Sequence, residues 1–248
     1  GWLTFGSEIR AVVAGLRETP GVDAEAVRLF LQYRYTPAPW TIIQGVRKLA
    51  PGPCLICEKG ECREERWYDF RPKQTDGKGN VAAAKSALLQ RYREGMQRHL
   101  LSDVPVGLLL SGGWDSGLLL GLMNEFGKGW PAYTGGYGEA CEDDELADAA
   151  ESARLLGARH IPVRLDQEKF ERELPFIVAA LEEPVASSSI VPMYFVCQRA
   201  REDVKVVLVG QGPDELFGGY VRHLGVFYGG IWRQLPSGLR HLMASGIS

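Results

Sequence analysis

A glycine-rich turn between a buried strand and a helix most constrains how this sequence can fold. Residues 108–116 read Leu-Leu-Leu-Ser-Gly-Gly-Trp-Asp-Ser, and an apolar helical pattern follows over residues 116–125. The first backbone N–H groups of such a helix lack partners inside the helix and point toward the turn. Gly112 and Gly113 leave room for an anion, and the carboxylate of Asp115 suits a bound Mg²⁺. The turn therefore predicts a site for a metal-bearing polyphosphate, although no lysine follows the glycines as in G-x-x-x-x-G-K-[ST].

Strands and helices alternate from residue 81 onward. The apolar pattern predicts helices over residues 81–101, 116–125, 145–156, 169–181 and 192–201, and strands over residues 106–110, 131–137, 160–165 and 204–209. Pro175 is expected to interrupt its helix and to begin a new first turn. This alternation is typical of an α/β fold, in which helices cover both faces of a parallel sheet.

The region before residue 81 has a different pattern. Residues 8–17 and 24–33 predict two short helices, and Asp23 is placed to cap the second. Residues 69–79 are polar and rich in glycine, which is typical of a linker between domains.

Residues 53–68 predict a hairpin of two strands around a turn at residues 59–60. Cys57 and Cys62 would then face each other across the hairpin. We expect both to be reduced thiols, with a disulfide or a metal as the alternatives. Three cysteines without a nearby fourth ligand make a poor zinc site.

Unusual residues gather at three predicted strand ends, at residues 111–116, 135–136 and 210–215. In an open parallel sheet, ligands bind at the carboxyl ends of the strands. Asp115 and Asp214 would meet there and hold Mg²⁺ against phosphate oxygens. The alternative for both carboxylates is to cap the start of a helix, and the two roles are compatible.

The composition argues against several classes of protein. With 45% hydrophobic and 24% charged residues, the sequence is that of an ordinary globular protein, and its net charge of −3 gives no electrostatic basis for binding nucleic acid. It contains no signal-peptide pattern and no apolar run near the roughly 18 residues that span a membrane. We therefore expect a cytoplasmic protein that binds neither nucleic acid nor membrane; its oligomeric state is left open, with a homodimer as the candidate.

Ser-Gly-Gly-x-Asp-Ser resembles the pyrophosphate loop of the N-type ATP pyrophosphatases. Further motifs stand in order along the chain, at residues 5–11, 37–42, 45–52, 66–69, 101–107 and 210–220. Together they resemble glutamine-dependent asparagine synthetase and its relatives over nearly the whole chain. The resemblance implies an adenine nucleotide α-hydrolase-like (PP-loop) α/β domain, preceded by the tail of an N-terminal nucleophile glutaminase domain of α+β fold. The implied division is residues 1–72 for the glutaminase part, 73–80 for a linker and 81–248 for the first part of the ATP-binding domain.

The same resemblance implies an amide-forming ligase that uses ATP and Mg²⁺. A carboxylate, aspartate in asparagine synthetase, is adenylated with release of pyrophosphate, and ammonia from glutamine then displaces AMP. The residues matching nucleotide-binding positions are Leu109, Ser111, Gly112, Gly113, Asp115, Ser116, Gly135, Val209 and Gly210. Asp115 and Asp214 match Mg²⁺ ligands, and Gln211 and Glu183 match catalytic positions near the acceptor. Residues 143–145 resemble a further motif of the family, although a helix-capping run of acids explains them equally well.

Three residues depart from the family pattern. Trp114 replaces a small aliphatic residue, Gly117 stands where serine is common, and Gln211 stands where asparagine synthetases commonly carry an acid. Glutamine cannot exchange a proton near neutral pH, so acid–base work at this position is in doubt. Two alternatives stay open: a related ligase with another acceptor, β-lactam-forming or peptide-cyclising, and a nucleotide-binding module that does not catalyse.

The family's glutaminase nucleophile is an N-terminal cysteine, whereas residue 1 is glycine. A catalytic lysine of the family would also lie beyond residue 248. We therefore expect the chain to be an internal part of a longer protein, and to be inactive by itself in both glutamine hydrolysis and ligation.

Overall fold

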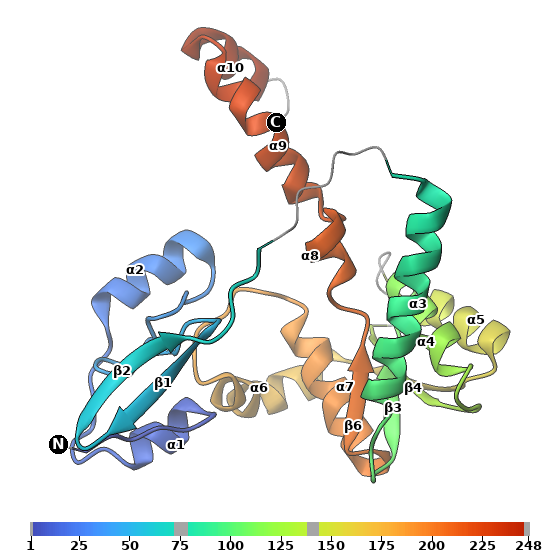
Figure 1. Cartoon of the computed structure of the whole chain (residues 1–248), viewed down its shortest axis with the longest axis horizontal. Helices are drawn as coiled ribbons and strands as arrows, with labels where there is room; N and C mark the ends of the chain where they lie inside the picture. The colour runs from blue at the N-terminus through green and yellow to red at the C-terminus, as the bar shows by residue number, and fades with distance from the viewer. Residues whose placement is uncertain (1, 72–78, 138–143, 246–248) are drawn as a thin grey trace. The chain divides into compact units, whose positions relative to one another are not determined.

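The computed structural model describes residues 2–71, 79–137 and 144–245, and it divides into two compact units (Figure 1). Residues 1–89 and 164–197 form the first unit, and residues 90–163 and 198–248 form the second. Most of the expected linker, residues 73–80, lies outside the described residues, as do Cys141 and Asp143. Each unit is described below by itself.

Short helices and a hairpin make up most of the first unit. Its elements are α1 (Ile9–Ala14), α2 (Ala24–Tyr33), β1 (Pro53–Glu58), β2 (Glu61–Arg66) and α6 (Gln167–Leu181), with the first turns of α3 (Val81–His99) and α7 (Ile190–Asp203). Asp23 caps α2 as expected, because its carboxylate accepts the N–H of Ala26 at 3.0 Å.

Strands β1 and β2 form the expected antiparallel hairpin. Lys59 and Gly60 both have positive φ, 54° and 86°, which matches the twist of the strands that a two-residue turn joins. This register places Cys57 directly opposite Cys62, with Cα atoms 4.1 Å apart, and a disulfide joins them. The prediction of reduced thiols is therefore wrong for this pair, because the turn fixes the two sulfur atoms side by side.

Helix α6 differs from its prediction at two points. It begins at Gln167 because Asp166 accepts the N–H of Lys169 at 2.7 Å, and it runs unbroken through Pro175. The expected interruption is wrong. A proline inside a helix removes a backbone hydrogen bond, but packing can hold the turns on either side. Ile177, in the turn after the proline, is only 3% exposed and supplies such packing.

A four-stranded sheet of order β5-β4-β3-β6 organises the second unit. The strands are β3 (Val106–Leu109), β4 (Pro131–Gly136), β5 (Arg159–Arg164) and β6 (Val206–Val209). Strand β3 pairs in parallel with both β4 and β6, which confirms the predicted α/β fold with a parallel sheet. The helices are α4 (Trp114–Met123), α5 (Leu146–Leu156), α8 (Pro213–Phe217), α9 (Val221–Gln234) and α10 (Ser237–Ser245), with the last turns of α3 and α7. None of the described helices is long and apolar enough to cross a bilayer.

Helices pack against this sheet through small and aliphatic side chains. Helix α5 contacts both β4 and α4. Ala149 of α5 and both Leu120 and Met123 of α4 are fully buried, as are Leu108 and Ala132 in the strands. Helix α5 ends at Gly157, which lies in the left-handed region of backbone conformation.

The last turns of α7 meet the sheet through a polar cluster around Tyr133. The buried hydroxyl of Tyr133 donates to Asp203 at 3.0 Å, and Arg199 and Arg159 pair with the same carboxylate at 3.1 and 3.5 Å. Burial and the bond to Asp203 raise the pKa of Tyr133 to about 12. The same bond, helped by the two arginines, lowers the pKa of Asp203.

We expect Tyr133→Phe to lower the free energy of unfolding by about 1.5–3 kcal/mol at neutral pH, since it removes one hydrogen bond to a charged group. Because the pKa of Asp203 is lowered in the folded state, its stabilising effect is present above the unfolded-state pKa and is lost as the pH falls through the folded-state pKa. Chemical unfolding at several pH values should therefore show the defect shrinking in acid. Tyr137→Phe, at an exposed tyrosine of the same unit, is the control, and an equal loss in both variants would contradict the account.

Candidate functional site

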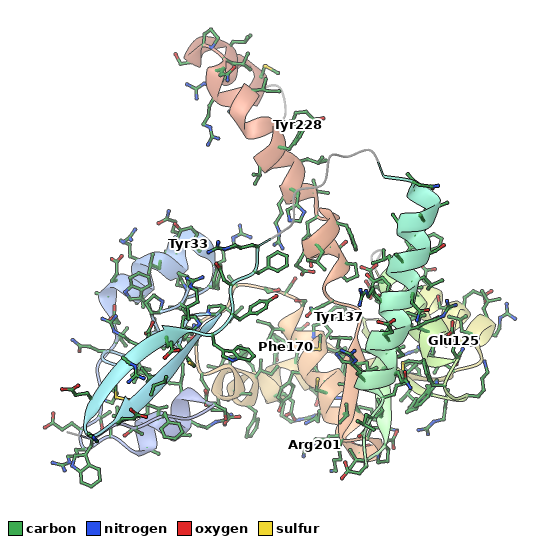
Figure 2. The ribbon with its side chains drawn as sticks, in the orientation of Figure 1. Tyr33, Glu125, Tyr137, Phe170, Arg201 and Tyr228 are labelled. Carbon is green, nitrogen blue, oxygen red and sulfur yellow. A yellow bond between two sulfur atoms is a disulfide. The ribbon has the colours of Figure 1, made fainter. Side chains whose placement is uncertain are left out.

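Three strands end side by side at one edge of the sheet. Leu109 at the end of β3 pairs with Val209 of β6 and with Tyr133 of β4, and the N–H of Leu110 donates to the carbonyl of Tyr133 at 2.9 Å. The turn after β3, Gly135 in β4 and Gly210 after β6 therefore lie at neighbouring strand ends. Figure 2 shows Tyr137, which follows β4 at this end. The predicted convergence of the three strand ends is confirmed.

Two serine hydroxyls close the turn that follows β3. The Ser116 hydroxyl oxygen accepts the N–H of Ser111 at 3.1 Å, and the two hydroxyl oxygens lie 2.8 Å apart. The N–H of Gly113 in turn donates to the Ser111 hydroxyl at 3.2 Å. Ser116 is buried, so these bonds fix the shape of the turn before any ligand binds. Trp114, by contrast, begins α4 with its side chain 95% exposed.

Helix α5 explains why residue 112 is a glycine. A Cβ atom at Gly112 would lie 2.6 Å from the Cβ of Asp148 and 3.4 Å from one of its carboxylate oxygens. Asp148 stands in the first turn of α5, so the packing of that helix brings a carboxylate beside the turn. Sequence reasoning missed Asp148, because only the fold brings α5 to residue 112.

Gly210 brings the end of β6 against the first turn of α4. A Cβ atom at Gly210 would lie 2.8 Å from the backbone nitrogen of Ser116 and 3.1 Å from the carbonyl carbon of Asp115. Contacts shorter than 3 Å are not tolerated by rigid backbone atoms, so only glycine fits here. The residues that follow, Gln211 and Asp214, are thereby held close to the start of α4.

Asp115 and Asp214 occupy equivalent positions in their helices. Each is the second residue of its helix, and the capping positions are taken by Gly113 and Gly212. The alternative that both carboxylates are helix caps is therefore wrong. Partial burial raises the pKa of Asp115, and the negative charges of Asp214 and Glu215 raise it further. A cation bound between the two aspartates would relieve this repulsion.

Glu215 orders the segment that carries Asp214. Its carboxylate accepts the N–H of Gly212 at 2.9 Å and the hydroxyl of Tyr220 at 2.8 Å. The bond to Tyr220 is the main reason why the pKa of Glu215 is lowered. The guanidinium of Arg222 lies over the Tyr220 ring, 4.1 Å from its centre. This role of Glu215 depends on contacts with Gly212 and Tyr220 and could not be predicted from its place next to Asp214.

The donor set fits magnesium bound together with a polyphosphate. Among the described residues, no group of three or more His, Cys, Asp or Glu side chains could hold a metal ion. Magnesium usually takes only one or two carboxylates from a protein and fills its other positions with phosphate oxygens and water. Asp115 and Asp214 supply two carboxylates and therefore match this requirement. The described residues do not offer a metal site built from protein side chains alone.

The two predicted catalytic residues lie in different units. Gln211 is exposed between Gly210 and Gly212 in the second unit. Glu183 belongs to the first unit, where its carboxylate accepts the N–H of Ile42 at 3.0 Å and pairs with the ammonium group of Lys48. Both of its oxygens are thus engaged inside that unit.

Asp144 contributes a side-chain hydrogen bond at the start of α5. A carboxylate oxygen of Asp144 accepts the N–H of Leu146 at 2.8 Å, and Asp144 also lies against Gly136, where a Cβ would meet both of its oxygens at 2.8 Å. The helix-start role weighed for residues 143–145 is therefore present at Asp144.

A parallel sheet with glycine-rich turns and paired carboxylates at its carboxyl ends is typical of α/β proteins that bind a ligand at the strand ends. Comparison with known proteins identifies the family to which the chain belongs. The family model for asparagine synthase matches residues 87–244, and the model for a glutamine amidotransferase domain matches residues 1–68. The chain belongs to the asparagine synthase family.

The relatives are longer proteins. The chain is similar to asparagine synthetase [glutamine-hydrolyzing] 1 of Bacillus subtilis, with 31% identity over 96% of this chain and 37% of that protein. It is 34% identical to a putative asparagine synthetase [glutamine-hydrolyzing] of Mycobacterium tuberculosis, over 80% of this chain and 31% of the other. Among solved structures, NH3-dependent NAD synthetase of Campylobacter jejuni covers 57% of this chain and is itself covered to 61%, with 17% identity and a TM-score of 0.37. The chain thus spans about a third of the length of the two synthetases.

We expect Asp115→Asn to weaken binding of magnesium ATP at least about tenfold, since it removes one carboxylate of the pair. The same change should stabilise the free protein at neutral pH. The folded-state pKa of Asp115 is raised, so stability falls as the pH rises from the ordinary value of 3.8 through the folded-state pKa, and asparagine abolishes this fall. Calorimetric titration and chemical unfolding measure the two effects. Asp103→Asn, an exposed acid before β3, is the control, and equal loss of affinity in both variants would remove the metal assignment.

Gly210→Ala should cost about 1–3 kcal/mol in the free energy of unfolding and should also weaken nucleotide binding, because the new methyl group forces β6 away from α4. Gly117→Ala is the matched control, since in the described part of the chain no atom outside its own helix would lie within 4 Å of a Cβ there. Chemical unfolding measures the stability of both variants, and calorimetric titration with magnesium ATP measures their nucleotide binding. Unchanged stability in Gly210→Ala would show that the close approach is not required.

Proposed function

We propose that this chain is the ATP-binding part, together with part of the glutaminase domain, of a glutamine-dependent amide-forming ligase. One observation carries the proposal: the close approach of Gly210 to Ser116 sets Asp214 and Asp115 together beside the glycine-rich turn. The family membership and the match of residues 1–68 to an amidotransferase domain support glutamine as the nitrogen source.

The nucleotide is placed by backbone groups in this proposal. The first N–H groups of α4, with Gly112 and Gly113, bind the polyphosphate, and the hydroxyls of Ser111 and Ser116 hold the turn in shape. Backbone groups at the strand ends contact the adenosine part; these residues are Leu109, Gly135, Val209 and Gly210. Asp115 and Asp214 would hold Mg²⁺, which neutralises phosphate charge as pyrophosphate forms.

The reaction then proceeds in two displacements. An oxygen of the acceptor carboxylate, aspartate in the leading form of the proposal, attacks the α phosphorus of ATP, and pyrophosphate leaves. Ammonia next attacks the acyl carbon, AMP leaves, and the nitrogen loses a proton to form the amide. The first step depends above all on neutralising the negative charge of the phosphates. The N–H groups of the turn and a cation held by the paired carboxylates would provide this. The second step needs a proton acceptor. Of the two residues at family positions near the acceptor, Glu183 carries a carboxylate that can take the proton, whereas Gln211 can only orient the nucleophile through hydrogen bonds.

Gln211 favours a second candidate function. Its side chain can orient a nucleophile through hydrogen bonds but cannot take up the proton that ammonia releases. A related ligase with a different nucleophile, β-lactam-forming or peptide-cyclising, would place less demand on this position. The full-length protein assayed for pyrophosphate release with aspartate and with other carboxylates separates the two, and release with none of them would indicate a module that binds nucleotide without catalysis.

Gln211→Glu in the full-length protein distinguishes the roles of this residue. If ammonia is the nucleophile, amide formation should hold or rise while pyrophosphate release stays unchanged, because a carboxylate can accept the proton. If Gln211 donates a hydrogen bond to a larger acceptor, both rates should fall, since the variant loses a donor and adds a charge near Asp214. The measurement pairs the two product assays, and a joint fall would rule out simple ammonia transfer at Gln211.

A further inference from the structure

Glu182 stabilises the start of helix α1 from far along the chain. Its carboxylate accepts the N–H groups of Ile9 and Arg10, the first two residues of α1, at 2.7 and 3.2 Å. It also pairs with the guanidinium of Arg10 at 2.6 Å. The first N–H groups of a helix have no partner within the helix, so an acid from another segment satisfies donors that would otherwise need water.

Glu183 makes a second link of the same kind. One of its oxygens accepts the N–H of Ile42 at 3.0 Å, and the other pairs with the ammonium group of Lys48. Lys48 also donates to the carbonyl of Thr36 at 2.7 Å, so this pair fixes the loop between residues 36 and 48 as well.

Both acids are largely removed from solvent. The side chains of Glu182 and Glu183 are each 13% exposed. Glu182 ends α6 with a φ of 59°, in the left-handed region that costs a residue with a side chain about 1 kcal/mol or more. A third link follows, since the N–H of Ala186 donates to the carbonyl of Arg34 at 3.0 Å. Residues 182–186 are thus tied at several points to residues 9–48.

These contacts join two regions that different family models match. The amidotransferase segment is defined here as residues 1–68 and the synthase segment as residues 87–244, after the two family models that match them. Glu182 and Glu183 belong to the synthase segment, and the partners given above for their carboxylates belong to the amidotransferase segment. The structure nevertheless groups residues 164–197 with residues 1–89 in one compact unit.

We propose that Glu182 is a positioning residue that holds the amidotransferase segment on the synthase segment, so that ammonia released by the first is used by the second. The inference rests on the proposed function. Ammonia is small and exchanges readily with solvent, so a loosened junction loses it before it reaches the acceptor. Glu183, with its ion pair to Lys48, reinforces the same junction.

The test uses the full-length protein with Glu182→Ala. Glutamine-supported amide formation should fall about tenfold to a hundredfold, the loss expected when reacting groups are misplaced by ~1 Å. Ammonia-supported amide formation and glutamate release should change less than about twofold, because neither needs the junction. The ratio of amide formed to glutamate released is the decisive readout, since a merely structural role would lower all activities together.

Two further variants complete the design. Glu182→Gln keeps an acceptor for the N–H groups of α1 but loses the ion pair, so its ratio should lie between those of wild type and Glu182→Ala. Arg10→Met removes the ion-pair partner and leaves Glu182 in place, which keeps the test available if Glu182→Ala fails to fold. Glu171→Ala, at an exposed acid of the same helix, is the control that should not change the ratio.

Equal loss of the ammonia-supported and glutamine-supported reactions in Glu182→Ala, or an unchanged ratio in all variants, would overturn the proposal. Hydrogen exchange at Ile9 and Arg10 separates this failure from failure of the proposed function. If the wild type forms no amide from either nitrogen source, the proposed function is contradicted. If exchange at these two amides is the same in wild type and Glu182→Ala, the proposed junction is contradicted. Faster exchange in the variant supports the tie independently of catalysis.

Discussion

The end of β6 lies so close to the first turn of α4 that no side chain fits between them. A Cβ at Gly210 would come within 2.8 Å of the backbone of Ser116, so the contact is possible only because glycine has no Cβ. The contact brings Asp214 near Asp115 and places Gln211 beside the turn. Burial raises the pKa of Asp115, and the charge of Asp214 raises it further. A rigid parallel sheet makes this approach available, because it fixes Leu109 and Val209 in register.

Much of the fold could be predicted because local signals and global packing agree. The β-branched and apolar runs became β3, β4, β5 and β6, and Asp23 began α2 where expected. The exceptions come from contacts that no local pattern encodes. Helix α6 passes through Pro175 because packing around Ile177 holds it, and Cys57 joins Cys62 because hairpin register sets the sulfurs together. The grouping of residues 164–197 with the N-terminal segment is likewise a tertiary property.

The candidate site also has parts that could be predicted from the sequence and parts that depend on tertiary contacts. The glycine-rich turn and the carboxylates Asp115 and Asp214 could be named from sequence, since their chemistry lies in short motifs at strand ends. Asp148, which lies against Gly112, depends on how α5 packs. The partners of Glu182 are 172 or more residues away in sequence, so their ion pair and hydrogen bonds become visible only in the structure. Residue roles at the nucleotide remain predictions, whereas the backbone geometry that supports them is observed.

The most direct test is a crystal structure of the full-length protein with Mn²⁺ and an ATP analogue that carries a methylene group between the α and β phosphorus atoms. Manganese replaces magnesium and can be located by its anomalous scattering. The account predicts one metal peak within about 2.0–2.3 Å of a carboxylate oxygen of both Asp115 and Asp214, with the β and γ phosphates against Gly112 and Gly113. A nucleotide bound elsewhere, or a metal that contacts neither aspartate, would contradict it.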